Sequence, residues 1–336
     1  MRAIWLLYLL LLTNCQKLSF YTQGTRGQLE ILRKSTSNKT LITSPDTSDF
    51  LKQRLLLAEE LCSFATEELD LPGESAYHKY ADLGRDHVVF VIYAAPEFSL
   101  EPKKWFYPIV GEMVYRGYFN KDDAEAYARS LREQGFEVHL GGTDAYSTLG
   151  FFHDPILNTF VDYPEIDFAE TIFHELTHRR IFVKGDTTFN ESLANAVAEE
   201  GIRRWLISKG RTGELDDYEE RLIRRRDFYQ QIEITKTQLE QLYASKLPEE
   251  DMRKRKQDIL KELKKRADEL QRRWGGKQLE EWLKIELTNA HLLSLATYNE
   301  QIPRFRKLLS DCGGDFRAFF EKVEKVKKSD EPLPTD

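Results

Sequence analysis

The sequence predicts an α+β fold that is mostly helical, with a small mixed sheet and a long helical hairpin arm. Residues about 20–80 and 167–207 carry apolar residues at helical spacing, whereas residues about 86–163 mix a helical stretch with short strand-like runs. Residues about 213–280 are dense in charge and in helix formers. A chain of 336 residues can bury a sizeable core, as one large domain or two small ones.

The N-terminus predicts a signal peptide. Arg2 precedes an apolar run over residues 4–12, which is too short to span a membrane stably. Cys15 follows this run and resembles the lipidated cysteine of a bacterial lipobox, with ordinary secretion as the alternative. We therefore expect a lipoprotein signal peptide over residues 1–15 and a single domain over residues 16–336, into which the hairpin is inserted.

The predicted location is the bacterial periplasm, with the protein held to a membrane only by its N-terminal lipid. Gln16, directly after the cysteine, favours the outer membrane. Cys62 and Cys312 could form a disulfide there, but Cys62 suits a buried thiol equally well, so no bond is predicted. The net charge of -7 argues against nucleic-acid binding, because no basic field would attract phosphates.

The middle of the chain alternates between strand and helix signals. Residues 87–95 predict a strand, residues 122–135 predict a helix that ends at its glycine, and residues 136–140 predict another strand. Residues 145–152 and 158–163 are strand-like as well. These runs are the source of the predicted sheet.

The segment His174-Glu175-Leu176-Thr177-His178 predicts a zinc site with its own catalytic base. Two histidines four apart on a helix lie on one face, with Cβ atoms about 5–6 Å apart, so both can reach one metal ion. The glutamate between them can accept a proton from a metal-bound water without binding the metal. Asp167 and Glu170 predict a capping box at the start of this helix. The alternative is a pair of exposed histidines beside a solvated glutamate.

A zinc hydrolase needs a third protein ligand and leaves the fourth position to water. A second helix follows after a short linker and places Glu191 in its first turn, so we assign Glu191 as the third ligand of one Zn²⁺. Glu199 and Glu200 are rivals deeper in the helix, and Glu191 could instead only complement the helix dipole. Three residues are candidate N-caps of this helix: Thr187, Thr188 and Asn190.

The charged stretch predicts an antiparallel helical hairpin. Pro248 interrupts it and suits the start of the second helix. Leu239, Leu242 and Tyr243 should face Ile259, Leu260 and Leu263 across the hairpin. The hairpin could gate a cleft or bind a protein partner, or it could be a solvated arm packed on its own base. Gly275 ends it, and helical sequence continues to Tyr298.

Two motifs in this chain resemble the gluzincin arrangement, in which HExxH is followed by a helix carrying N-E-x-x-A: HELTH at 174–178 and FNESLA at 189–194. More closely, the chain resembles the bacterial putative aminopeptidase lipoproteins. The resemblance rests on residues 19–34, 114–119, 145–157, 174–178, 189–201 and 288–292. It implies a zincin-like metallopeptidase domain and a zinc-dependent peptidase, with aminopeptidase activity expected. Glu175 would activate a zinc-bound water against a peptide substrate.

Further site residues follow from this expected activity. Peptide hydrolysis needs a hydrogen-bond donor for the developing oxyanion, and the candidates are Tyr298, His291, Tyr118 and Tyr146. We choose Tyr298, because related zinc peptidases often keep the donor on the segment after such an arm. An aminopeptidase also needs a carboxylate for the free amine, for which the candidates are Glu112 and Glu170.

An edge strand above the HExxH helix commonly binds extended substrate in zincins. Ser147, Thr148 and Gly150 are assigned to such a strand, with an ordinary core strand as the alternative. His153 lies in a turn that the resemblance places near the active site. The alternative function is a lipid-anchored scaffold with a structural or inactive metal site, but the paired HExxH and NExxA motifs favour the peptidase.

Overall fold

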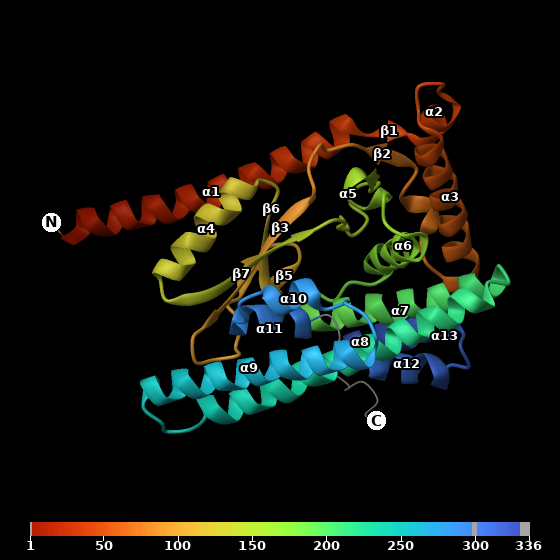
Figure 1. Cartoon of the computed structure of the whole chain (residues 1–336). Helices are drawn as coiled ribbons and strands as arrows, with labels where there is room; N and C mark the ends of the chain where they lie inside the picture. The colour runs from red at the N-terminus through yellow and green to blue at the C-terminus, as the bar shows by residue number, and fades with distance from the viewer. Residues whose placement is uncertain (1, 298–300, 330–336) are drawn as a thin grey trace.

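A computed structural model describes residues 2–297 and 301–329 of the chain, with side chains for residues 18–297 and 301–326. Helices surround small sheets (Figure 1), so the predicted α+β class, mostly helical with small sheets, is confirmed. The largest hydrophobic core joins helices from the N-terminal, central and C-terminal parts of the chain. The two helices that carry the HELTH and NESLA segments lie within this core.

Three helices form the N-terminal part, as predicted: α1 (Arg2–Lys34), α2 (Asn38–Thr43) and α3 (Asp49–Leu69). Ser48 caps α3, because its hydroxyl accepts a hydrogen bond from the backbone N–H of Leu51 at 3.2 Å. The side chain of Cys15 lies outside the described side chains, so the lipid anchor stays a prediction. Among the described residues, no helix has the length and apolar character needed to cross a membrane.

The central sheet is antiparallel, with strand order β6 (Tyr115–Tyr118), β3 (Val89–Pro96) and β7 (Phe136–Thr143). Its two long strands and the helix α4 (Lys121–Glu133) match the predicted strand, helix, strand order, and Gly135 follows α4 with a φ of 87°. Side chains on one face of β3, such as Ile92, pack against α4. The other face of β3 lines the candidate site described below.

Two smaller sheets flank this one. The first contains β1 (Thr36–Ser37), β2 (Lys79–Ala81) and β8 (Ile156–Leu157), and it is mixed because β2 pairs antiparallel with β1 and parallel with β8. The second is a hairpin of β4 (Trp105–Tyr107) and β5 (Gly111–Met113). A short 3-10 helix, η1 (Gly73–Ser75), follows α3.

The two further strands predicted at residues 145–152 and 158–163 are wrong. Residues 145–152 form a loop with a turn, in which Leu149 and Gly150 both have positive φ. The loop folds around a buried ion pair between Asp154 and Arg179. This ion pair outweighs the alternation of apolar and polar residues that predicted a strand. The second run contains the one-turn helix α5 (Asn158–Val161), so the apolar alternation there was not a strand signal.

The two motif helices are α6 (Glu165–Arg180) and α7 (Thr187–Ser208), as predicted, but both predicted caps are wrong. α6 begins directly after Pro164, and Asp167 pairs with Arg221 instead of capping. Asp186 caps α7 by accepting from the backbone N–H of Phe189 at 3.0 Å. Asp167 is therefore used in an ion pair, and the cap of α7 lies one residue before the predicted candidates.

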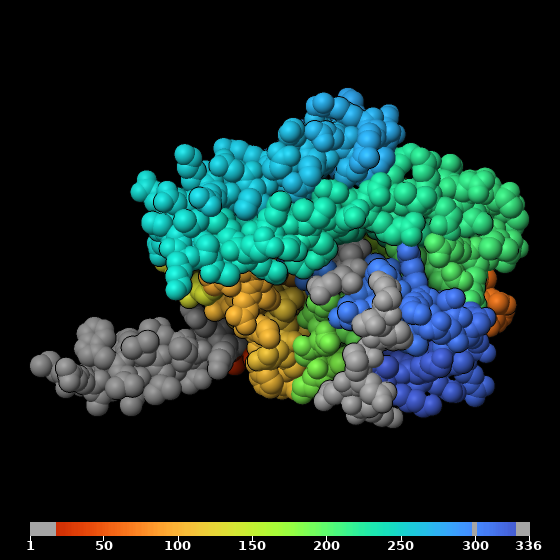
Figure 2. All heavy atoms as spheres, turned by 90° about the horizontal axis from the view of Figure 1, so that it is seen from below, coloured from red at the N-terminus to blue at the C-terminus, as the bar shows by residue number. Residues whose placement is uncertain are grey.

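The predicted hairpin is α8 (Thr212–Tyr243) and α9 (Glu249–Arg273), with Pro248 at the start of α9. The six residues predicted to face one another share one apolar cluster: Leu239, Leu242, Tyr243, Ile259, Leu260 and Leu263. Figure 2 shows the hairpin running across the whole of one face of the molecule. Its tip is docked on the central sheet, because buried Lys256 reaches Glu137 of β7 and the carbonyl of Glu97. The hairpin is therefore more than a solvated arm packed on its own base.

The C-terminal part contains α10 (Glu280–Lys284), α11 (Asn289–Ala296), α12 (Ile302–Asp311) and α13 (Phe316–Ser329). The helical sequence predicted after Gly275 is thus broken at residues 285–288, and Tyr298 lies outside the described residues. Cys62 and Cys312 are both free, with Cys62 buried. Burial raises the pKa of the Cys62 thiol to about 12, which suits an inert core thiol.

Candidate metal centre

The helices α6 and α7 pack side by side along most of their lengths. Gly201 of α7 permits this contact, because a Cβ there would lie 2.8 Å from the ring of Phe173 on α6. Asn190 fixes the linker between the helices, since its side-chain amide accepts from the N–H of Val183 at 2.7 Å and donates to its carbonyl at 2.8 Å. The first turn of α7 therefore lies opposite the end of α6.

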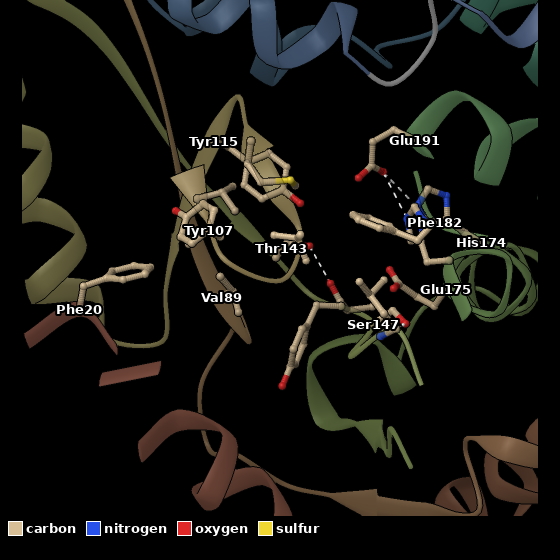
Figure 3. A pocket seen from close by; sticks show the side chains of 18 residues that line it. Phe20, Val89, Tyr107, Tyr115, Thr143, Ser147, His174, Glu175, Phe182 and Glu191 are labelled. Carbon is tan, nitrogen blue, oxygen red and sulfur yellow. Dashed lines mark hydrogen bonds and ion pairs between the residues drawn. The ribbon is translucent and has the colours of Figure 1, made fainter. Parts of the chain in front are cut away.

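This packing brings His174, His178 and Glu191 together. The Nε2 atoms of the two histidines are 3.1 Å apart, and the Oε2 atom of Glu191 lies 3.3 Å from one and 3.6 Å from the other. Ligand atoms about 2.0–2.1 Å from a tetrahedral ion are about 3.3–3.4 Å apart. The three donor atoms therefore fit one zinc ion, and all three side chains line the adjoining cavity (Figure 3).

His174 is oriented by Asn195, a residue that the sequence did not single out. The Nδ1–H of His174 donates to the side-chain oxygen of Asn195 at 2.9 Å, because an amide oxygen can only accept. In the neutral form of the His174 ring, this hydrogen bond leaves the lone pair on Nε2, which is the atom that faces Glu191. Asn195 lies four residues after Glu191 on α7, so helical spacing was the available signal.

The cluster is strongly charged. Burial raises the pKa of Glu191, but the two imidazoles outweigh it and lower the pKa to about 2. Burial also lowers the pKa of His174, while the hydrogen bond and charge of Glu191 raise it to about 9. The site thus holds an ionised carboxylate ready to bind a cation.

Glu175 lies beside the cluster but takes no part in it. Its side chain is 7% exposed, and its Oε2 atom has no hydrogen-bond partner in the described part of the chain. Burial raises the pKa of this carboxyl, more than the neighbouring histidines lower it. An unpartnered buried carboxyl that lines the cavity suits a group that gains and loses a proton.

A cavity of about 300 Å³ opens from the cluster, and Tyr115 of β6 lies across it from Glu191 (Figure 3). Burial, followed by the charges of Glu191, Tyr93 and Glu175, raises the pKa of the Tyr115 phenol well above its ordinary value. Its hydroxyl therefore keeps its proton and can serve as a donor. The sequence analysis did not single out Tyr115, although it lies in the 114–119 segment of the family resemblance, because only the pairing of β6 with β3 brings it to the site.

A second cavity, of about 450 Å³, adjoins the site at His174. It shares His174 and Glu175 with the first cavity, and its remaining walls carry charged and polar side chains such as Asp144, Arg225 and Tyr229. We call the first cavity the apolar chamber and the second the polar chamber. Arg225 and Tyr229 of α8 line the polar chamber, so the hairpin contributes to its wall.

Of the four oxyanion donors suggested by the sequence, the structure brings neither His291 nor Tyr118 to the cluster. His291 stacks on His139 with ring centroids 4.5 Å apart, and Tyr118 packs edge-on against Phe20 at 5.4 Å, both outside the cavity walls. Tyr146 does line the apolar chamber, but its hydroxyl donates to Gln28. Tyr298 lies outside the described residues and stays a prediction.

The predicted substrate strand is replaced by the loop described above. Ser147 lines the apolar chamber, whereas the Thr148 hydroxyl donates to Asp154 at 2.6 Å and Gly150 lies in the turn with a φ of 86°. His153 faces away, with its Nδ1 2.8 Å from the carbonyl oxygen of Ser75. Thr143, the last residue of β7, lines both chambers.

The remaining carboxylates have other partners. Glu112 is 59% exposed and lies near Lys104, while Glu170 pairs with Arg221 and Arg225. The two rival metal ligands are also paired: Glu199 with Arg306 and Arg225, and Glu200 with Arg203 and Arg204. Among the described residues, Glu191 is the carboxylate that joins the two histidines.

The fold and the site define an α+β protein in which two helices bring a His-His-Glu cluster beside a buried glutamate. The chain belongs to the family described as putative aminopeptidase, which matches residues 19–333. This match supports a peptidase and confirms the putative aminopeptidase family, whereas the gluzincin and lipoprotein parts of the resemblance stay predictions. No curated protein and no solved structure matches the chain.

Proposed function

We propose that the protein is a zinc-dependent aminopeptidase, in which His174, His178 and Glu191 hold one Zn²⁺. The observation that carries this proposal is the triangle of donor atoms, 3.1, 3.3 and 3.6 Å on its sides, with the unpartnered carboxyl of Glu175 beside it. A scaffold would need a structural metal at most, and it would not need a buried carboxyl without a partner.

When bound, zinc supplies a Lewis acid that polarises the substrate carbonyl and makes a coordinated water more acidic. Glu175 takes the proton of the attacking water, because its side chain lines the cavity and its Oε2 atom has no hydrogen-bond partner among the described residues. The same carboxyl then passes this proton to the departing amine. Burial raises the pKa of this carboxyl, which makes its carboxylate a stronger base for the first transfer.

Tyr115 supplies the hydrogen bond to the developing oxyanion in this proposal. The residue lines the cavity, lies across from Glu191 and keeps its hydroxyl proton. A donor held in place before the reaction stabilises the charge without reorganisation, which accounts for about 10²–10³-fold in rate in acyl transfer enzymes. Tyr115 thereby takes the role that the sequence suggested for Tyr298.

The location of the enzyme is also part of the proposal. We infer a lipid on Cys15 that holds the protein on the periplasmic side of a bacterial membrane, from the short apolar run before this cysteine. Mass spectrometry of the mature N-terminus tests this inference. A diacylated residue 15 supports it, whereas an unlipidated N-terminus beginning after residue 15 contradicts it and leaves the peptidase proposal intact.

A peptide digest tests the aminopeptidase proposal. The zinc-loaded protein is incubated with matched peptides that carry either a free or an acetylated N-terminus, and the products are identified by mass spectrometry. Stepwise loss of N-terminal residues from the free peptides alone supports an aminopeptidase. Internal cleavage of both sets assigns an endopeptidase instead, and the absence of any product contradicts the peptidase proposal.

A further inference from the structure

The two chambers that adjoin the site differ in chemistry. The wall of the apolar chamber comes from β3 (Val89, Val91), the β4–β5 hairpin (Tyr107, Val110, Met113) and α1 (Phe20). Glu175 and Glu191 of the site itself are its charged lining residues. The polar chamber instead carries charged side chains from α6, α8 and the end of β7. A substrate bound across the site therefore meets apolar surface on one side and charge on the other.

The apolar wall depends on the alternation of side chains between the two faces of β3. Phe90, Ile92 and Ala94 point toward α4, so Val89 and Val91 point to the opposite face, toward the site. Figure 3 shows Val89, Tyr107 and Phe20 lining the chamber on the side away from the histidines. The chamber is thus built on a strand of the central sheet, which holds its shape.

The size of the chamber indicates the class of group that fills it. A dry apolar cavity of roughly 150 Å³ is enough to bind a benzene ring. The chamber here is about 300 Å³, so it can hold an aromatic or long aliphatic side chain together with the backbone that carries it. A glycine or alanine would leave most of this space unfilled and would lose the contacts that its walls offer.

A charged side chain would be unfavourable in the chamber. An ammonium or guanidinium group there would be removed from water among valines, a methionine and aromatic rings. Its nearest anions would be Glu175 and Glu191, which are needed for the proposed proton transfer and for the metal. A carboxylate side chain would likewise be removed from water among these apolar walls.

We propose that the apolar chamber is the specificity pocket of this enzyme and takes a large apolar side chain, aromatic or long aliphatic, from a residue next to the scissile bond. This proposal rests on the proposed peptidase function and adds its substrate class. Because the chamber opens directly from the metal cluster, the side chain that fills it belongs to one of the two residues joined by the cleaved bond.

Two sets of peptides test the substrate class. In each set, phenylalanine, leucine, alanine, lysine or glutamate occupies one of the two positions that flank the scissile bond, and kcat/KM is measured with the zinc-loaded protein. We expect phenylalanine and leucine to exceed alanine, lysine and glutamate by about 10–200-fold at one of the two positions. A flat response at both positions, or a preference for a charged residue, overturns the proposal.

A pair of variants locates the preference in the chamber. Val91→Phe fills it, so the ratio of kcat/KM for phenylalanine over alanine should fall at least about tenfold. Ile109→Phe is the matched control, because Ile109 neighbours Val110 in the sequence but is 66% exposed and outside the lining. The control should keep the wild-type ratio. An unchanged ratio in folded Val91→Phe places the pocket elsewhere and overturns the assignment.

A binding measurement separates failure of this proposal from failure of the peptidase proposal. Calorimetry on zinc-loaded Glu175→Gln compares phenylalanine amide, alanine amide and lysine amide. Tighter binding of phenylalanine amide supports the chamber as a pocket for large apolar side chains, even if the wild type hydrolyses no peptide. Such binding without any hydrolysis contradicts only the proposed peptidase function. Equal affinity for all three amides overturns the chamber proposal, whatever the wild type hydrolyses. The same measurement decides the matter if Val91→Phe fails to fold.

Discussion

Asn195 accepts a hydrogen bond at 2.9 Å from the ring nitrogen of His174 that faces away from Glu191. The contact fixes the tautomer of His174 and aims its Nε2 lone pair at the proposed metal. Asn195→Ala should weaken zinc binding about 10–100-fold, because it removes this support. Competition with a chromogenic chelator measures the change. Asn195→Asp keeps an acceptor and should restore most of the affinity, and wild-type affinity in Asn195→Ala contradicts the assigned role.

Arg225 of α8 joins the two helices that carry the metal ligands. Its guanidinium lies 2.8 Å from Glu170 of α6 and 3.6 Å from Glu199 of α7, and the Glu199 side chain is 2% exposed. Arg225→Leu should lower the free energy of unfolding by about 1.5–3 kcal/mol, because both carboxylates lose a charged partner. Urea denaturation measures this loss. Arg226→Leu, an exposed neighbour, is the control, and an equal effect from both variants rejects the bridging role.

Tyr115 is the proposed oxyanion donor, and its removal should act on the transition state alone. Tyr115→Phe should reduce kcat about 10²–10³-fold while the zinc content and KM change little. Steady-state kinetics with a metal analysis separates these quantities. Tyr118→Phe on the same strand should stay close to wild type, because Tyr118 does not line the cavity. A loss in Tyr118→Phe with full activity in Tyr115→Phe would reverse the assignment.

The stacked pair of His139 and His291 should make the fold sensitive to acid. Burial, then the charges of His139 and Lys264, lowers the pKa of His291 from 6.5 to about 4. The unfolded chain binds this proton below about pH 6.5 and the folded chain does not until about pH 4, so stability is kept above pH 6.5 and falls as the pH drops. The loss from pH 7 to 4.5 should be about 2–3 kcal/mol.

Urea denaturation at both pH values measures this loss in the wild type and in His291→Phe. The substitution keeps an aromatic ring against His139 but removes the titrating group, so the difference between the two pH values should shrink. His78→Gln, at an exposed histidine, is the control and should keep the wild-type difference. An unchanged pH dependence in His291→Phe rejects the buried histidine as its source.

The features that the sequence predicted correctly depend on local pattern. The helix around His174 and His178, the start of α9 at Pro248 and the strand over residues 87–95 all follow from spacing along a few turns or a single strand. Glu191 could be predicted as the third metal ligand from the sequence, because the short linker allows α7 few positions relative to α6. Its carboxylate lies 3.3 Å from His174 in the structure, and its role as a metal ligand stays a proposal.

The features that the sequence did not predict depend on contacts between distant segments. Tyr115 reaches the cavity only through strand pairing, and the loop at Thr148 is fixed by a buried ion pair of Asp154 with Arg179. Asp186 rather than its neighbours caps α7, because several adjacent residues could serve and tertiary packing selects one. The polar chamber depends on where α8 lies, which no pattern within α8 specifies.

The most direct test of the zinc peptidase centre is hydrolysis by metal-loaded Glu175→Gln, with the zinc content of each sample measured by mass spectrometry. We expect about one zinc per chain in the wild type and in Glu175→Gln, and a loss of most zinc in His178→Ala. Hydrolysis by Glu175→Gln should fall by about 10²-fold or more at equal zinc content. Activity within a few-fold of wild type in Glu175→Gln, or full zinc in His178→Ala, would contradict the account.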